Sequence, residues 1–156
     1  MATLTISFTS STTYPTNGYI VKYRQTGTVP YTTVTPNPTT SPVLINSLGS
    51  GVSYEGTIQA DCGNGQYGTV STFSATVAAR FNVSRDPSSA SNACALTNKN
   101  FVFYSASAVV SQNTQVYSDV QLSVIFNNAG FYSDGTNVYQ ISSAGIVLSV
   151  ALCQIP

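Results

Sequence analysis

The sequence is short of charged and titratable side chains. Only 6% of its 156 residues are Asp, Glu, Lys or Arg, five acidic and five basic, and it has no histidine and no tryptophan. An ordinary soluble domain carries about a quarter of its residues as charged side chains. Because titratable groups perform most acid–base catalysis, a sequence with so few has little catalytic chemistry available. We therefore predict a protein that is not an enzyme.

The polar groups that remain form no catalytic or metal-binding pattern. A serine nucleophile needs a base, and neither Lys22 nor Lys99 follows a serine at the S-x-x-K spacing. Nothing in the sequence brings two of the five carboxyl groups together as a catalytic pair. The segment Asp134-Gly135-Thr136-Asn137 holds one carboxylate, too few for a calcium loop, and is better explained as a hairpin turn. We expect no cofactor and no metal.

Long apolar runs and basic clusters are lacking as well. No stretch approaches the roughly 18 apolar residues that a membrane span requires. The segment Met1–Phe8 has neither the basic nor the apolar region of a secretion signal, which predicts a protein that the general pathway does not export. Zero net charge gives no electrostatic basis for binding nucleic acid or anionic membranes. Neither is expected as a partner.

The three cysteines lack the paired short spacing of zinc and redox motifs. Cys94 and Cys153 bracket the C-terminal half and would hold it closed if oxidised, whereas Cys62 lies apart from them. Alternatively, all three are small buried apolar side chains. The sequence leaves both interpretations open.

What the chain does contain is strand-forming sequence. Apolar residues alternate with Ser and Thr, and Gly, Pro and Asn clusters such as Gly63-Asn64-Gly65 separate the runs. The runs are centred on Leu4, Ile6 and Phe8; on Tyr19, Val21 and Tyr23; on Tyr54, Ile58, Ala60 and Cys62; on Val70 and Phe73; and over 101–104, 115–117, 120–126, 138–141 and 146–152. Short strands at such intervals predict an all-β chain with a sandwich.

The composition changes between residues 80 and 95. The stretch Arg85-Asp86-Pro87-Ser88-Ser89-Ala90-Ser91-Asn92 is polar and rich in serine, and it has the character of a linker. This predicts a β-sandwich over residues 1–79, a linker over 80–95 and a small second β module over 96–156.

Three segments of the first half resemble a fibronectin type III domain, which has an immunoglobulin-like sandwich. Gly18–Arg24 is similar to the third strand of that family, and Leu48–Tyr54 to a stretch in which a Leu precedes a tight turn and a Tyr follows it. Ala60–Gly65 is similar to the family's sixth strand and its hairpin, which is rich in Asn and Gly. The resemblance implies a "tyrosine corner", in which the Tyr54 hydroxyl bonds to the backbone across the turn. The residues expected to carry this structure are Phe8, Tyr19, Tyr23, Leu48 and Tyr54.

The first half departs from that family in two ways. Phe8 stands where the family usually has Trp, and the sequence before it leaves no room for the family's first strand. Strand Ala2–Thr9 would then have an unpaired edge, and such an edge readily pairs with a neighbouring chain. We predict that the second module or another protein chain covers it.

The second half is similar to a small β module of gut-bacterial surface proteins and of virion proteins of their phages, including crAss-like phages. The residues that carry the likeness are Val116-Tyr117-Ser118-Asp119, Phe126-Asn127-Asn128, Gly130-Phe131-Tyr132-Ser133, the stretch Val138–Val147, and Cys153. The resemblance implies an accessory or display module without catalytic residues.

Tyrosine is the dominant aromatic residue, with ten copies in a setting rich in Ser and Asn. Antibody-like contact surfaces have this composition. The candidate contact residues in loops are Tyr14, Tyr31, Tyr67 and Tyr132. Packing between neighbouring strands is the alternative role for each of them.

These features favour a non-enzymatic structural protein of a bacteriophage virion, either a capsid auxiliary or decoration protein or a head-fibre component. Its partners would be other virion proteins, such as capsid or fibre subunits, or further copies of itself. Its location would be the virion, assembled in the host cytoplasm. The alternative is an adhesive module that binds the host surface or a glycan at the bacterial cell surface. A weakly charged sandwich with a polar, tyrosine-containing surface fits both.

Overall fold

The computed structural model describes residues 2–10 and 15–154 and confirms the all-β class, with one short helix among its described residues. The chain divides into two compact units, residues 1–77 and 78–156, and each is described here by itself. The boundary follows strand β7, close to the end of the sandwich that the sequence predicts.

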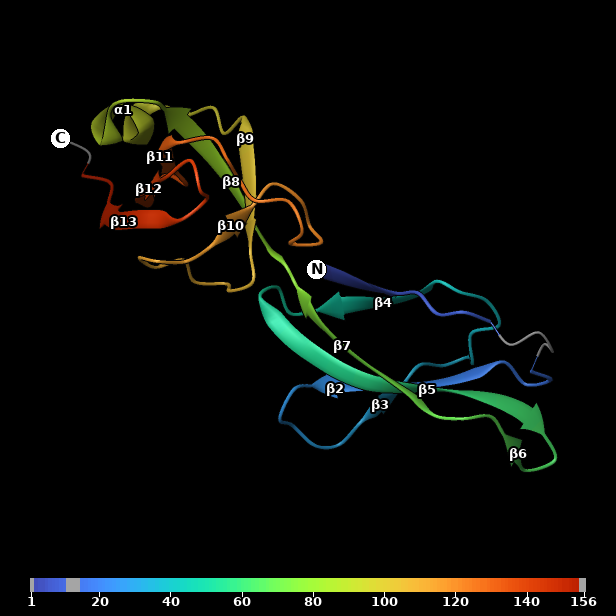
Figure 1. Cartoon of the computed structure of the whole chain (residues 1–156). Coiled ribbons are helices and arrows are strands. Elements are labelled where there is room, and N and C mark those ends of the chain that lie inside the picture. The colour runs from blue at the N-terminus through green and yellow to red at the C-terminus, as the bar shows by residue number, and fades with distance from the viewer. Residues whose placement is uncertain (1, 11–14, 155–156) are drawn as a thin grey trace. The chain divides into compact units, whose positions relative to one another are not determined.

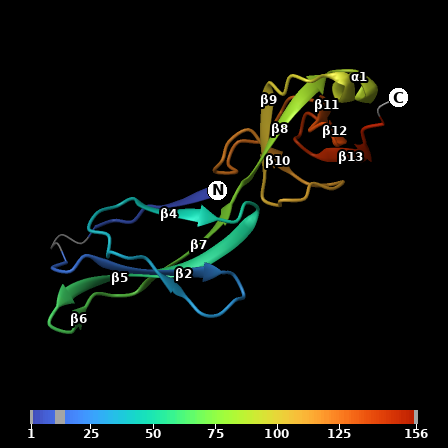
Figure 2. The same ribbon diagram turned by 180° about the vertical axis from the view of Figure 1, so that it is seen from behind.

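The first unit is a β-sandwich. Its strands are β1 (Ala2–Ile6), β2 (Tyr19–Gln25), β3 (Thr32–Thr33), β4 (Val43–Leu48), β5 (Val52–Gly63), β6 (Gln66–Tyr67) and β7 (Ser71–Val77). One layer contains only β1 and β4, and the other has the order β3-β2-β5, with β6 and β7 both paired to β5. Figure 1 and Figure 2 show β4 and the N-terminal strand over the layer of β2, β5 and β7.

The alternation seen in the sequence produces the core between these two layers. Leu4 and Ile6 of β1 are buried, and Thr3 and Thr5, which alternate with them, are exposed. From the opposite layer, Val21 and Ile58 are buried against them, and they sit directly across from each other in the pairing of β2 with β5. Strands with one apolar face pack in this way because burial of each such side chain stabilises the fold by about 1.5–3 kcal/mol.

The expected tyrosine-corner hydrogen bond is present. The backbone N–H of Gly49 donates to the hydroxyl of Tyr54 at 3.0 Å, across the turn between β4 and β5. Leu48, just before the turn, is buried in the core, and Tyr23 packs beside it half-buried, with its ring centroid 6.4 Å from that of Tyr54.

The second unit is a six-stranded antiparallel sheet with the order β10-β9-β8-β11-β12-β13. Its elements are β8 (Ala79–Asp86), α1 (Ala90–Ala95), β9 (Phe101–Ser105), β10 (Val116–Tyr117), β11 (Gly130–Ser133), β12 (Asn137–Ile141) and β13 (Val147–Leu152). The sheet curls on itself: Val147 of β13 exchanges backbone hydrogen bonds with Asn113 and Thr114, and Gln115 bridges Ile146.

The linker predicted over residues 80–95 is wrong, because the structure places strand β8 and helix α1 there. Ser84 is buried, and its hydroxyl donates to the carbonyl oxygen of Ala93 at 2.7 Å. Ser89 caps the helix by accepting the N–H of Asn92, and Asp86 accepts the N–H of Ser89 at 2.7 Å. Asp86 and Ser89 thus accept backbone N–H groups at the N-terminus of helix α1, which is why polar residues stand there.

The strand predicted over residues 120–126 is also wrong, because this stretch is a loop in which only Ile125 forms an isolated bridge, to Tyr117. The carboxylate of Asp119 accepts the backbone N–H groups of Ser123 and Val124, at distances from 2.7 to 3.2 Å. These bonds satisfy the amides locally, and so the loop needs no partner strand.

A disulfide joins Cys94 of α1 to Cys153, which follows β13. It settles the choice that the sequence leaves open for these two cysteines. The bond closes a loop with a sequence separation of 59 and fastens the helix to the last strand of the sheet. Cys62 is a free, exposed cysteine in the first unit.

Candidate docking groove

The most distinctive feature of the first unit is the edge strand β1. Among the strands of the described residues it pairs only with β4, so its other edge has no partner strand there. The unpaired backbone groups of an edge strand are a template for a further strand. The sequence Ala2-Thr3-Leu4-Thr5-Ile6 carries neither a charge nor a proline, the two devices that commonly protect such edges.

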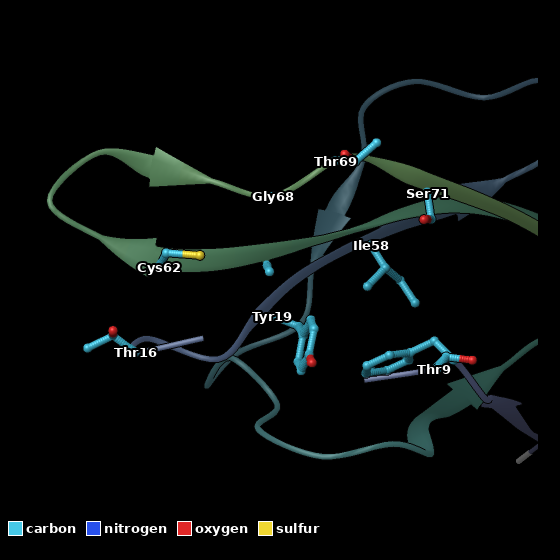
Figure 3. A pocket seen from close by; sticks show the side chains of 10 residues that line it. Thr9, Thr16, Tyr19, Ile58, Cys62, Gly68, Thr69 and Ser71 are labelled. Carbon is cyan, nitrogen blue, oxygen red and sulfur yellow. The ribbon is translucent and has the colours of Figure 1, made fainter. Parts of the chain in front are cut away.

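A hollow of about 660 Å³ opens beside the chain that continues β1. Its lining comes from β2, β5 and β7, from the chain after β1 and before β2, and from the segment between β6 and β7. It consists of Phe8, Thr9, Thr16, Tyr19, Ile58, Ala60, Cys62, Gly68, Thr69 and Ser71. Figure 3 shows Tyr19 and Ile58 projecting into this space, with Ser71 beside it and Cys62 farther along β5. We call this hollow, together with the free edge of β1, the docking groove.

The docking groove exists because the two layers are unequal. The layer of β1 and β4 covers the inner face of the larger sheet at Val21 and Ile58, which are buried. Farther along β5, Ala60 is half-buried, and on β7 Ser71, which lies opposite Ile58, is exposed. The inner face of β5 and β7 is therefore left partly uncovered at the end nearest Phe8.

The chemistry of the docking groove is neutral. None of its ten lining residues is charged, and the lining is mainly aliphatic and aromatic carbon with threonine and serine hydroxyls. The rings of Phe8 and Tyr19 meet edge to face with centroids 4.6 Å apart and form one wall. Two small residues form another wall, since a Cβ atom added at Gly68 would lie 3.1 Å from that of Ala60.

Strand β7 flanks the docking groove on the other side. It approaches β1 without pairing with it, and among the described strands it pairs only with β5. The edge strand β7 and the chain that continues β1 thus border one uncharged hollow. Such an arrangement can accept an extended peptide, which bonds to an edge through its backbone and places alternate side chains in the hollow.

The predicted structural residues are divided by the fold. Phe8 and Tyr19 line the docking groove, and Tyr19 is also a buried residue of the core. Tyr23, Leu48 and Tyr54 belong to the core and its corner turn and do not line the groove. Phe8 lies beyond the end of β1, and its backbone N–H donates to the Ser41 hydroxyl at 2.9 Å on the side of β4.

The four candidate contact tyrosines differ in their exposure to solvent. Tyr132 is wrong as a contact residue, because it is fully buried in the core of the second unit and its hydroxyl donates to the carbonyl oxygen of Asn128 at 2.7 Å. Tyr67 and Tyr31 are 57% and 40% exposed, and both are available at the surface. Tyr14 lies outside the described residues.

A second, more polar hollow of about 390 Å³ lies around Tyr31. The Arg24 guanidinium stands 4.3 Å from the centre of the Tyr31 ring and pairs with Glu55 at 2.7 Å. Thr57, Thr72 and Ser74 add hydroxyl groups to its lining. An aromatic ring beside hydrogen-bonding side chains is suited to a polar ligand, although one face of this ring is already occupied by arginine.

The described residues contain no group of three or more His, Cys, Asp or Glu side chains placed to hold a metal ion. In the same part of the chain, no helix is both long enough and apolar enough to cross a membrane. Comparison of the chain with protein-family models, with curated proteins and with solved structures finds no match.

The sequence predicts little of the docking groove. Ala60, Gly68 and Ser71 belong to no sequence motif. They leave room for the hollow because they are small. The one usable signal is the alternation of Leu4, Ile6 and Phe8 without charge or proline, which predicts a strand with an unprotected edge but not the hollow beside it.

Proposed function

We propose that this chain is a non-enzymatic structural protein of a bacteriophage virion, a capsid auxiliary or head-fibre component that acts through protein–protein contacts. The observation that carries the proposal is the docking groove: an uncharged hollow beside a strand edge that lacks a partner among the described residues. A surface of this kind is suited to holding another polypeptide. We propose the virion as the setting because the sequence motifs of the second half resemble those of phage virion modules.

Two further features support a role in assembly. The zero net charge of the chain does not oppose close association with neighbours. The disulfide between Cys94 and Cys153 is of the type that persists outside a reducing cytoplasm, and a released particle provides such surroundings.

The test is the composition of purified particles. Mass spectrometry of virions from the source of this sequence should detect the chain at a copy number fixed by the symmetry of the capsid or fibre. Recombinant protein should bind particles that lack it and should not bind host cells. Absence of the chain from purified particles contradicts the proposal.

The hollow around Tyr31 favours a second candidate, an adhesive module that binds a glycan at the host surface. Its polar lining and its single aromatic ring are the observations behind this alternative. Recombinant protein that agglutinates host cells, and that loses this activity in the variant Tyr31→Ala, would reverse the ranking. The variant Tyr67→Ala is the matched control, since Tyr67 is exposed on a different strand.

A further inference from the structure

We propose that the docking groove binds an extended, uncharged segment of a different polypeptide, which adds to the free edge of β1 as a further strand. This inference takes its setting from the proposed function and adds to it the kind of partner that the docking groove binds. It commits to a peptide strand and to the way in which that strand is held.

The edge of β1 indicates a strand as the occupant. Along Ala2–Ile6 only one side of the backbone is paired, to β4, and the groups of the other side are spaced for hydrogen bonding with a parallel or antiparallel chain. A sugar or a lipid does not match that spacing, whereas an extended peptide does. From Ala2 to Ile6 the edge is five residues long, which corresponds to about 17 Å at about 3.3 Å per residue.

The lining of the docking groove indicates the side chains of that strand. Alternate residues of an added strand would point toward the inner face of β5 and β7, over Ile58, Ala60 and Ser71. The lining provides no charged group to pair with a buried charge, and an unpaired buried charge is costly. The inward residues of the partner are therefore apolar or hydroxylated, and proline is excluded wherever the backbone N–H must donate.

The β1 strand of a second copy is poorly suited to this role. Leu4 and Ile6 of that copy are already buried in its own sandwich, so they cannot also fill the hollow of a neighbour. The occupant must be a segment whose apolar side chains are not yet used, such as an extended arm of another protein.

The experiment uses a random nonapeptide library in mRNA display, selected on the full chain and counter-selected on the variant Ser71→Trp. Ser71 is exposed, lies opposite Ile58 and lines the docking groove, so an indole at this position fills the hollow. The matched control is Ser74→Trp, since Ser74 is exposed on the same strand and lines the hollow around Tyr31 instead. Selected peptides are then synthesised and titrated by fluorescence against all three proteins.

The expected peptides are uncharged at alternate positions and free of proline in their centre. They should bind Ser71→Trp about ten-fold or more weakly than wild type and bind Ser74→Trp within about two-fold of wild type. Their binding should slow hydrogen exchange at the Ala2–Ile6 amides. A proline placed at the centre of a selected peptide should abolish binding.

Several results would overturn the inference. These are a selection that yields no peptide sensitive to Ser71→Trp, binding that leaves exchange in β1 unchanged, or a preference for charged peptides. If sedimentation instead shows a dimer that Ser71→Trp dissociates, the occupant is a second copy and the assignment to a different polypeptide is wrong. None of these outcomes depends on whether the chain occurs in virions, so the two proposals can fail separately.

Discussion

The hydroxyl of Tyr139 donates a hydrogen bond to Oδ2 of Asp134 across 2.6 Å. The other carboxylate oxygen of Asp134 accepts the backbone N–H groups of Thr136 and Asn137, at 2.8 and 2.7 Å. One carboxylate therefore links the turn between β11 and β12 to an aromatic ring of the core. Burial raises the pKa of Asp134, but the hydrogen bonds from Asn137, Tyr139 and Thr136 together outweigh it, so the pKa lies below its ordinary value.

This lowered pKa predicts a specific dependence of stability on pH. Because the pKa of Asp134 is lower in the folded protein than its ordinary value of 3.8, its stabilising contribution is complete above that value and is lost as the pH falls through the folded pKa. The urea midpoint of wild type should therefore fall more than that of Asp134→Asn between about pH 6 and about pH 2.

The comparison has an internal control. The pKa values of Asp86 and Asp119 are also lowered, chiefly by backbone hydrogen bonds from Ser88 and from Val124, and both proteins share these groups. The difference between wild type and Asp134→Asn thus reports Asp134 alone. Parallel pH profiles for the two proteins would contradict the prediction.

The corner turn of the sandwich gives a second prediction. Tyr54→Phe removes the acceptor of the Gly49 N–H and should lower the free energy of unfolding of the first unit by about 1 kcal/mol. Urea denaturation measures the loss. Tyr67→Phe changes an exposed tyrosine of β6 and should alter stability by less than about 0.5 kcal/mol. Equal effects of the two substitutions would mean that the hydrogen bond contributes nothing.

The disulfide gives a third prediction. Cys94→Ser combined with Cys153→Ser opens a loop with a separation of 59 residues, which should cost the second unit about 2–4 kcal/mol through the greater freedom of the unfolded chain. Thermal unfolding with and without reductant measures the same loss in wild type. Cys62→Ser should leave stability and its response to reductant unchanged, because Cys62 is a free and exposed thiol. A reductant effect that persists in the double variant would contradict this.

Gly145 gives a fourth prediction. It has a φ of 69°, and an added Cβ atom would lie 2.8 Å from the carbonyl oxygen of Phe126. Gly135 also has a positive φ, 95°, but its nearest neighbour is the flexible end of Lys99. Gly135→Ala should therefore cost about 1–2 kcal/mol from backbone strain alone. Gly145→Ala should cost clearly more, as measured by urea denaturation, and an equal cost would show that the backbone near Phe126 moves freely.

Strands with a clear period of two are the part of the fold that could be predicted. The pattern of Tyr19, Val21 and Tyr23 indicates β2, because its buried face is apolar. The strand β12 is indicated instead by its content of strand-forming residues, since its neighbours Val138 and Tyr139 are both buried. The corner turn could be predicted for a similar reason, since its hydrogen bond is local to Leu48–Tyr54.

Elements that polar residues stabilise could not be predicted. Ser84 and Asp86 look like linker residues, yet they hold the strand and helix together through internal hydrogen bonds. The loop after Asp119 contains strand-forming valines. Its conformation is nevertheless set by the Asp119 carboxylate, which accepts hydrogen bonds from the backbone N–H groups of the loop. Composition alone does not distinguish a solvated hydroxyl from one that caps a helix.

The docking groove could be predicted only in part. The alternation of Leu4, Ile6 and Phe8 predicts the strand β1, but the hollow depends on which strand pairs with β5 and on where the small residues Ala60 and Gly68 fall. Such placement is set by long-range strand pairing. The burial of Tyr132 is likewise a consequence of the curled sheet, in which β11 lies at the centre.

The disulfide between α1 and the residue after β13 has a mechanical consequence. Tension applied along the chain from residue 78 to the C-terminus passes through β8 and α1 and then crosses directly from Cys94 to Cys153. The strands β9 to β13 lie in the closed loop and are bypassed by the force. Pulling can therefore unravel β8 and α1 while the polypeptide from Leu96 to Leu152 cannot be drawn out to its full length.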